Sequence, residues 1–274
     1  MPDLTEQFPK ALALQVRLVS LGPARIPAML AHPDWKTPAP IVIWLHGRTV
    51  RKETDPGRYL RWIRAGIAAC AVDLPGHGER FEADLHTPAR TLDLVAGAVA
   101  EVDHIVEALS AREYEGVLDL DRMALGGMSA GGMVTLRRLC DAHPFVCAAV
   151  EATSGNLVDM YRARGGHGEG ALPRHSLEAI APLNPMEHLE SWRPIPLLAL
   201  HTRADRLVPV AAQEKFIDAL RRHYATRRAD PSMIELMTWD KTGAPDEHAG
   251  FGRFANDAKN AQVEFLAKHL ARAT

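Results

Sequence analysis

Hydrophobic and polar positions form two kinds of pattern in the first part of the chain, and each predicts a different kind of strand. Residues 11–20 and 24–33 alternate well enough to form an antiparallel opening pair. After the proline-marked break TPAP, residues 41–47 (IVIWLHG) form a continuous apolar run, which a strand buried on both faces needs. The chain therefore begins with a strand pair and continues into a buried sheet.

From there on, strand patterns and helix patterns follow one another. Further apolar runs predict strands at residues 66–74, 122–128, 145–152, 195–202 and 233–239. Between or after these runs, periodic patterns predict helices near residues 56–65, 89–111, 130–142, 210–224 and 253–272. This alternation favours a mostly parallel sheet of eight strands, covered on both faces by helices and joined by right-handed crossovers. We expect a single α/β domain over residues 1–274.

One segment departs from this alternation. From Thr153 to Trp192, about forty residues separate two predicted strands, which is more than a crossover needs. The segment contains the glycine-rich and charged run RARGGHGEGALPRH, and then NPMEHLESW, which predicts a short helix. Because long loops in compact domains are often functional, residues 153–192 are either a small lid over a site or a surface excursion.

Composition and charge exclude several classes of protein. The chain has 274 residues, of which 47% are hydrophobic and 24% charged, as in an ordinary globular protein with a sizeable core. A net charge of -2 favours neither nucleic acid nor an anionic membrane as a partner. The start MPDLTEQFPK lacks a basic region followed by an apolar run, and no stretch is long enough to span a bilayer. We expect a cytoplasmic protein.

The cysteines and histidines give no sign of a disulfide framework or a metal site. Cys70, Cys140 and Cys147 are odd in number, and each lies in an apolar run where a small buried thiol fits. Their spacing matches no zinc pattern, and the 13 histidines contain no HExxH pair. We expect reduced cysteines and no metal cofactor.

The segment GGMSAGG contains the pattern Gly-x-Ser-x-Gly as Gly127, Met128, Ser129, Ala130 and Gly131. It closes a predicted strand and opens a predicted helix, and such a tight turn requires a strained backbone with small neighbours. The serine oxygen would then stand clear of the sheet, at the C-terminal ends of the strands and in front of a helix N-terminus. We expect Ser129 to be a nucleophile. The alternative is that it only caps the following helix.

A serine hydroxyl is a poor nucleophile at neutral pH, so it needs a base, and the base needs an orienting carboxylate. Asp205 lies in the loop that follows the predicted strand at 195–202. His248 lies in the loop that follows the predicted strand at 233–239. Both would therefore reach the same edge of the sheet as Ser129, and we expect them to be the acid and the base.

Other ionisable residues compete less well for these roles. Asp246 and Glu247 adjoin His248, but neighbours along a chain rarely aim at one another's functional atoms. Asp240, at the end of its predicted strand, is a weaker competitor. Two histidines inside predicted elements are interpreted as structural, namely His201 and His223.

The attacked carbonyl oxygen becomes negatively charged and needs two backbone donors. One expected donor is the N–H of Ala130, directly after the serine. The loop WLHGRT supplies the other, because Gly47 allows a close approach and the N–H of Arg48 follows it. His46 is interpreted as a loop-ordering residue. We expect the loop at 72–81 (VDLPGHGERF) to line the wall of the pocket.

These segments together resemble the α/β-hydrolase superfamily. The resemblance rests on HG after the third strand, DLPGHG after the fourth, GGMSAGG, HTRADRLVP and the late EHAGF, and it covers nearly the whole chain. More narrowly, the chain resembles small bacterial carboxylesterases related to dienelactone hydrolases and to the catalytic domain of prolyl oligopeptidases. The resemblance implies the α/β-hydrolase fold, a triad of Ser129, His248 and Asp205, and an oxyanion hole made by the amides of Ala130 and Arg48.

Two departures from these relatives narrow the expected activity. Dienelactone hydrolases use a cysteine nucleophile, so Ser129 argues against that activity. No propeller domain precedes the hydrolase part of these 274 residues, so an esterase is favoured over an oligopeptidase.

The sequence therefore predicts a serine hydrolase, and more specifically a carboxylesterase that cleaves small, short-chain acyl esters through an acyl-enzyme without an organic or metal cofactor. A peptidase or an acyltransferase would use the same triad. The alternative from another class is a non-catalytic protein that binds a small molecule on a hydrolase scaffold.

Overall fold

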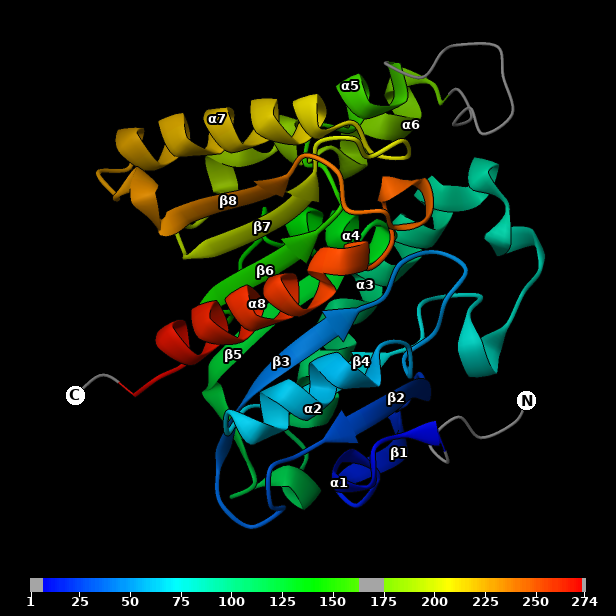
Figure 1. Cartoon of the computed structure of the whole chain (residues 1–274), viewed down its shortest axis with the longest axis vertical. Coiled ribbons are helices and arrows are strands. Elements are labelled where there is room, and N and C mark those ends of the chain that lie inside the picture. The colour runs from blue at the N-terminus through cyan, green and yellow to red at the C-terminus, as the bar shows by residue number, and fades with distance from the viewer. Residues whose placement is uncertain (1–6, 163–174, 273–274) are drawn as a thin grey trace.

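The computed structural model describes residues 7–162 and 175–272. Its strands form one eight-stranded sheet in the order β1-β2-β4-β3-β5-β6-β7-β8 (Figure 1). The strands are β1 (Val16–Leu21), β2 (Ile26–Ala31), β3 (Ala39–Leu45), β4 (Ala68–Val72), β5 (Leu118–Met128), β6 (Cys147–Glu151), β7 (Leu197–Thr202) and β8 (Ile234–Trp239). The pairs β1–β2 and β2–β4 are antiparallel, and the other pairs are parallel.

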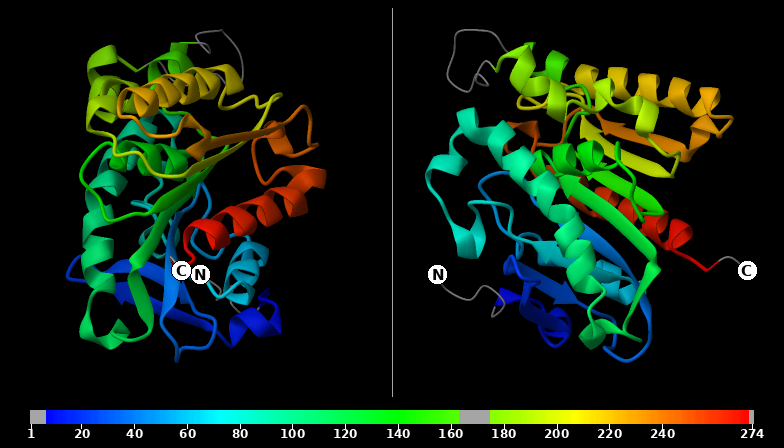
Figure 2. Two further views of the ribbon diagram at one scale, coloured as in Figure 1. Left: turned by 90° about the vertical axis from the view of Figure 1, so that its left-hand side faces the viewer. Right: turned by 180° about the vertical axis from the view of Figure 1, so that it is seen from behind.

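Helices cover both faces of this sheet (Figure 2). They are α1 (Lys10–Ala13), α2 (Pro56–Arg64), α3 (Thr91–Leu109), α4 (Ala130–Arg138), α5 (Leu157–Arg162), α6 (Leu177–Ile180), α7 (Val210–Thr226) and α8 (Ala255–His269). The predicted α/β fold with a mostly parallel, eight-stranded sheet is therefore confirmed.

Several element boundaries differ from the prediction by a few residues, and two of these differences lie at the starts of β1 and β5. Residues 11–13, expected to begin a strand, belong to α1. Strand β5 begins at Leu118, well before the predicted start at residue 122. The pairing of β5 with β3 shifts register between Pro40 and Ile41, so the early residues of β5 pair with β3 in a different register from the later ones. That early part, LDLDR, contains polar residues, and the continuous apolar run begins only after it.

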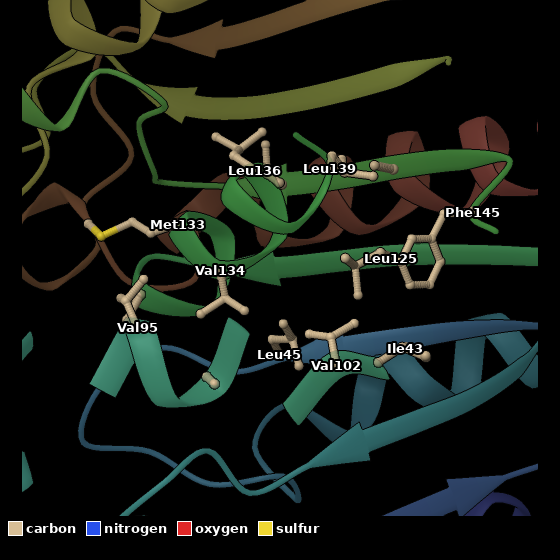
Figure 3. Close-up of a cluster of buried hydrophobic side chains, with 14 of the residues drawn as sticks. Ile43, Leu45, Val95, Val102, Leu125, Met133, Val134, Leu136, Leu139 and Phe145 are labelled. Carbon is tan, nitrogen blue, oxygen red and sulfur yellow. The ribbon is translucent and has the colours of Figure 1, made fainter. Parts of the chain in front are cut away.

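The central strands are buried on both faces, and each face has its own apolar cluster. Along β3, Ile41, Ile43 and Leu45 belong to one cluster, while Val42 and Trp44 belong to the other. The first cluster also contains side chains of α3, α4 and α7, and the second contains side chains of α1, α2 and α8. Figure 3 shows part of the first cluster, in which α3 and α4 pack on β3 and β5. The continuous apolar runs in the sequence reflect this burial on both faces.

The sheet topology places the candidate site. Because β3 to β8 are mutually parallel, the loops that follow them meet at one edge of the sheet. The long segment between β6 and β7 contains α5 and α6, but residues 163–174 lie outside the described residues, so the lid over 153–192 stays a prediction. In the described part of the chain, no helix combines the length and apolar character needed to cross a bilayer.

Candidate active site

Ser129 occupies the tight turn between β5 and α4. Its backbone has φ 53° and ψ −117°, an unusual conformation for a non-glycine residue. A Cβ added to Gly131 would lie 2.1 Å from the carbonyl oxygen of Leu45, so only glycine allows the turn to pack this closely on β3. The Ser129 side chain makes no capping hydrogen bond to α4. The alternative interpretation of this serine as a helix cap therefore has no support in its hydrogen bonding.

The hydroxyl of Ser129 lies next to His248. The Nε2 atom of His248 is 2.9 Å from the Oγ of Ser129, and its Nδ1 is 2.8 Å from Oδ2 of Asp205. The structure thus brings together the three residues that the sequence suggested, from the loops after β5, β7 and β8. Because a carboxylate accepts hydrogen bonds, Nδ1 carries the proton and Nε2 is free to accept from the serine.

The carboxylate of Asp205 is fully buried and held by several donors. Its Oδ1 accepts from the amides of Leu207 (2.7 Å) and Val208 (2.8 Å), which leaves Oδ2 for His248. The Nε2 atom of His201 lies 3.5 Å from Oδ2 of Asp205 and 2.9 Å from the Val208 carbonyl oxygen, so its ring supports this loop. The carboxylate is fixed in the orientation that a histidine-orienting acid needs.

The competing carboxylates are engaged elsewhere. Asp240 is 96% exposed and lies 3.7 Å from Arg203. Asp246 pairs with Arg206 at 3.1 Å. Glu247 accepts hydrogen bonds from the amides of its own loop. Because each of the three carboxylates is exposed or bonded elsewhere, none of them is placed to orient His248 as Asp205 does.

A cavity of about 460 Å³ opens onto Ser129 and His248. Its other lining residues include Arg48, Trp44, Arg58 and Glu151. The loop at 72–81, which we expected in the pocket wall, contributes none of the described residues that line this cavity. That loop instead contacts residues 46–53, whose Thr49 and Lys52 amides donate hydrogen bonds to it.

A buried ion pair forms part of the cavity wall. Both terminal nitrogens of Arg58 donate to Glu151, at 2.6 and 2.9 Å, and the guanidinium lies 4.2 Å from the ring centroid of Trp44. Arg58 also donates to Gln262 at 2.6 Å. Burial is the largest influence and opposes the charge on Arg58, but the attraction and hydrogen bonds of Glu151, together with the charge of Asp55, outweigh it and raise the pKa of the guanidinium.

The sequence analysis missed this ion pair, although a signal was present. Glu151 is a carboxylate at the end of an otherwise apolar strand run, FVCAAVEA. A charge in such a place must find a partner, because an unpaired buried charge is very costly. The sequence does not indicate which of the many arginines is that partner.

The two amides suggested as oxyanion donors lie beside the serine. Ala130 is the first residue of α4, a position whose amide has no partner within the helix. A Cβ added to Gly47 would lie 3.4 Å from the Cβ of Ser129, so the loop that bears Arg48 approaches the serine closely. Within residues 7–162 and 175–272, neither the amide of Ala130 nor that of Arg48 donates a hydrogen bond to the protein. The guanidinium of Arg48 donates to the carbonyl oxygen of His86.

Two further kinds of chemistry, metal binding and thiol reactivity, can be examined from the described side chains. Among the residues that the structure describes, no group of three or more His, Cys, Asp and Glu side chains is placed to hold a metal ion. The three cysteines are buried and free, and burial raises the pKa of Cys140 and Cys147 to about 12. The site therefore offers hydroxyl, imidazole and carboxylate chemistry.

Comparisons with known proteins identify the family to which the chain belongs. Residues 61–273 match the model of the prolyl oligopeptidase family. Esterase YjfP of Escherichia coli is 29% identical over 260 residues, which is 90% of this chain and 96% of YjfP.

Two solved structures share the fold at lower identity. The esterase PF2001 of Pyrococcus furiosus has a TM-score of 0.64 and 19% identity, with 93% of this chain and 91% of that chain covered. The acylaminoacyl peptidase of Pyrococcus horikoshii has a TM-score of 0.72 and 15% identity, with 94% of this chain and 42% of that chain covered. The expected resemblance to the α/β-hydrolase superfamily is confirmed. The chain belongs to the prolyl oligopeptidase family and is a serine hydrolase.

Proposed function

We propose that this protein is a carboxylesterase that hydrolyses small, short-chain acyl esters through an acyl-enzyme. The observation that carries the proposal is the series of contacts from Asp205 through His248 to Ser129, at 2.8 and 2.9 Å, which opens into the cavity. A cavity of about 460 Å³ is of the size that small-molecule ligands occupy. The similarity to esterase YjfP supports an ester as the substrate class.

In the first half of the proposed reaction, Ser129 attacks the ester carbonyl. His248 accepts the serine proton at Nε2 as the new C–O bond forms, and Asp205 stabilises the resulting imidazolium through Nδ1–H. The tetrahedral intermediate then collapses. The bond to the alcohol breaks, and His248 returns the proton to the leaving oxygen, so that the alcohol departs and the acyl group stays on Ser129.

In the second half, water takes the place of the alcohol. His248 removes a proton from the water as its oxygen attacks the acyl carbon, and the proton then passes to Ser129 as the carboxylic acid leaves. In both halves, the amides of Ala130 and Arg48 donate to the oxygen that becomes negatively charged. Such donors stabilise the transition state most when they are already oriented before the reaction.

A second candidate is peptide hydrolysis, which would use the same three residues. Membership of the prolyl oligopeptidase family favours this candidate over acyl transfer, which differs only in what accepts the acyl group. A binding protein without catalysis would keep the cavity but would not need the aligned imidazole and carboxylate.

Labelling with a fluorophosphonate probe tests the class of protein. We expect the wild-type protein to be labelled and Ser129→Ala to be unlabelled, because the probe reacts with an activated serine. A folded wild-type protein that resists labelling would favour the binding protein.

A substrate panel then tests the reaction. We expect p-nitrophenyl esters to be cleaved with the highest kcat/KM at short acyl chains, and aminoacyl p-nitroanilides to be cleaved more slowly. Faster cleavage of the anilides would favour the peptidase.

The single domain over residues 1–274, the lid over 153–192 and the cytoplasmic location remain predictions from the sequence.

A further inference from the structure

Two loops at the C-terminal edge of the sheet hold one another through their histidines. The Nε2 atom of His46 accepts from the amide of Leu74 at 3.0 Å. The Nε2 atom of His77 accepts from the amide of Thr49, also at 3.0 Å. We call these two reciprocal bonds the histidine clasp. The first bond involves His46 and the second involves Thr49, and Arg48, which carries the proposed second oxyanion donor, lies between these two residues in the sequence.

The remaining nitrogens of the two rings determine their protonation. The Nδ1 of His46 lies 2.6 Å from the carbonyl oxygen of Gly47, and the Nδ1 of His77 lies 2.9 Å from that of Pro75. A carbonyl oxygen only accepts, so Nδ1 carries the hydrogen in both rings and Nε2 is a bare acceptor. Both rings are buried and neutral, and burial lowers the pKa of each.

The clasp constrains the peptide that contains the Arg48 amide. The carbonyl of Gly47 and the N–H of Arg48 belong to one planar, trans peptide unit, so they point in opposite directions. Since His46 holds that carbonyl on its own side, the Arg48 N–H is turned away from His46. The next peptide unit, between Arg48 and Thr49, is held by His77 through its N–H.

Thr49 shows that this arrangement works against backbone preference. Its φ is 68°, in the left-handed region, which is a genuine outlier for a β-branched residue. Such strain persists only where the surroundings impose it. Without an acceptor for its amide, Thr49 would relax to negative φ and would rotate the neighbouring Arg48 peptide with it.

The loop that carries His77 is itself rigid. Asp73, at its start, is buried and accepts from the amide of Lys52 at 3.0 Å and from its ammonium at 2.8 Å. Arg80, at its end, donates to Glu101 of α3 through two nitrogens at 2.6 Å. The imidazole of His77 is therefore a fixed point against which the loop at 46–53 is set.

We propose that His77 is a positioning residue for the oxyanion hole: by accepting the Thr49 amide, it holds Thr49 in its strained conformation and keeps the Arg48 N–H aimed into the cavity. His77 does not line the cavity, so it acts through the loop rather than on the substrate. This inference rests on the proposed function of Ser129, His248 and the Arg48 amide.

Two matched amide variants test the inference, because each keeps a polar side chain. In His77→Gln, the side-chain oxygen reaches the place of Nε2 and can accept from Thr49. In His77→Asn, it reaches only the place of Nδ1. With p-nitrophenyl acetate, we expect kcat to fall about 10- to 100-fold in His77→Asn, since complete loss of one oxyanion donor costs about 100- to 1,000-fold. We expect KM to change little, and His77→Gln to keep most of the wild-type kcat.

A second substitution separates positioning from general loss of structure. Asparagine tolerates the left-handed region better than threonine does. Adding Thr49→Asn to the His77→Asn variant should therefore restore part of kcat, whereas a merely structural role for His77 predicts no such recovery. Circular dichroism and thermal unfolding check that each variant is folded.

The outcomes distinguish this inference from the proposed function. Equal kcat in the wild type and in folded His77→Asn would overturn the positioning role, as would a loss confined to KM, or equal losses in the Gln and Asn variants. If the wild-type protein does not cleave the ester and Ser129 is not labelled, the proposed function fails instead. If His77→Asn does not fold, kcat of His77→Leu, which keeps a buried side chain of similar size but cannot accept from the Thr49 amide, carries the test, and a wild-type value would overturn the inference.

Discussion

Asp205 and His248 lie 43 positions apart in the chain, yet Oδ2 of the carboxylate is 2.8 Å from Nδ1 of the imidazole. Asp205 holds this orientation because its other oxygen accepts from two backbone amides of its own loop. The ring of His248 is thereby kept with Nδ1 protonated and Nε2 facing the Oγ of Ser129.

Asp205→Asn should lower kcat strongly with little change in stability. An amide of the same shape stabilises the imidazolium poorly and favours the wrong tautomer, so we expect a loss of about 10³- to 10⁴-fold in kcat toward p-nitrophenyl acetate. The matched control is Asp240→Asn, since Asp240 is 96% exposed at the end of β8. A loss of activity in Asp240→Asn similar to that in Asp205→Asn would contradict the assignment of the acid.

Gly131→Ala and Gly57→Ala should have opposite effects on stability. At Gly131 the new methyl group would lie 2.1 Å from the backbone oxygen of Leu45, so α4 or β3 must shift. Overpacking of this kind costs about 1–3 kcal/mol or more. At Gly57, inside α2, the nearest atom is the flexible end of Arg61 at 3.4 Å, and alanine should stabilise the helix by about 0.5–1 kcal/mol.

Urea unfolding of the two alanine variants measures this difference. The expected order of unfolding free energy is Gly57→Ala above wild type, and wild type above Gly131→Ala. A Gly131→Ala protein as stable as the wild type would show that the turn at Ser129 is not closely packed on β3.

Glu151→Gln should destabilise the protein more than its conservative character suggests. The substitution removes the buried carboxylate from Arg58, which keeps the partly exposed Asp55 at 3.3 Å, and loss of one partner of a buried ion pair costs about 3–5 kcal/mol. Arg58→Met alone should also be destabilising. The double variant should lose less than the sum of the two, because it removes both charges together. Additive losses in a double-mutant cycle of unfolding free energies would mean that the two side chains do not interact.

The stability of the protein should fall as the pH is lowered from 7 toward 4. Burial lowers the pKa of His46 to about 4 and also lowers that of His77, whereas both titrate near 6.5 when unfolded. The unfolded chain therefore binds more protons below pH 6.5. Stability is fully present above that pH and is lost as the pH falls toward the folded pKa, by up to about 1.4 kcal/mol per pH unit for each histidine.

Unfolding by urea at several pH values checks this dependence. The unfolding free energy of His46→Gln should depend less steeply on pH than that of the wild-type protein, because one of the titrating groups is gone. A slope equal to that of the wild type would mean that His46 does not titrate differently in the folded and unfolded chains.

Much of the fold could be predicted from the sequence because its signals are local. A strand buried on both faces must be apolar throughout, and residues 41–47 show this without knowledge of their neighbours. The predictions failed at 11–13 and 118–121, where α1 is too short to give a clear period and the early part of β5 contains polar residues. Both errors lie at the ends of elements, where local patterns are weakest.

Part of the candidate site could also be predicted from local signals in the sequence. The glycines around Ser129 mark the tight turn in the sequence itself, and Asp205 and His248 stand directly after predicted strands, so their types and positions suggested the chemistry. The sequence by itself thus determined the kind of fold and the chemical groups available to it, because backbone preference and burial act over a few neighbouring residues.

Only the tertiary structure decided which of those groups meet. Glu151 and Arg58 are 93 positions apart, and nothing in either segment specifies the other. Likewise, the acceptor of the Thr49 amide belongs to His77, in a loop expected to line the pocket. Such partners depend on which parallel strands are neighbours and on their register, and these follow from the packing of the whole sheet and its helices rather than from any short stretch of sequence.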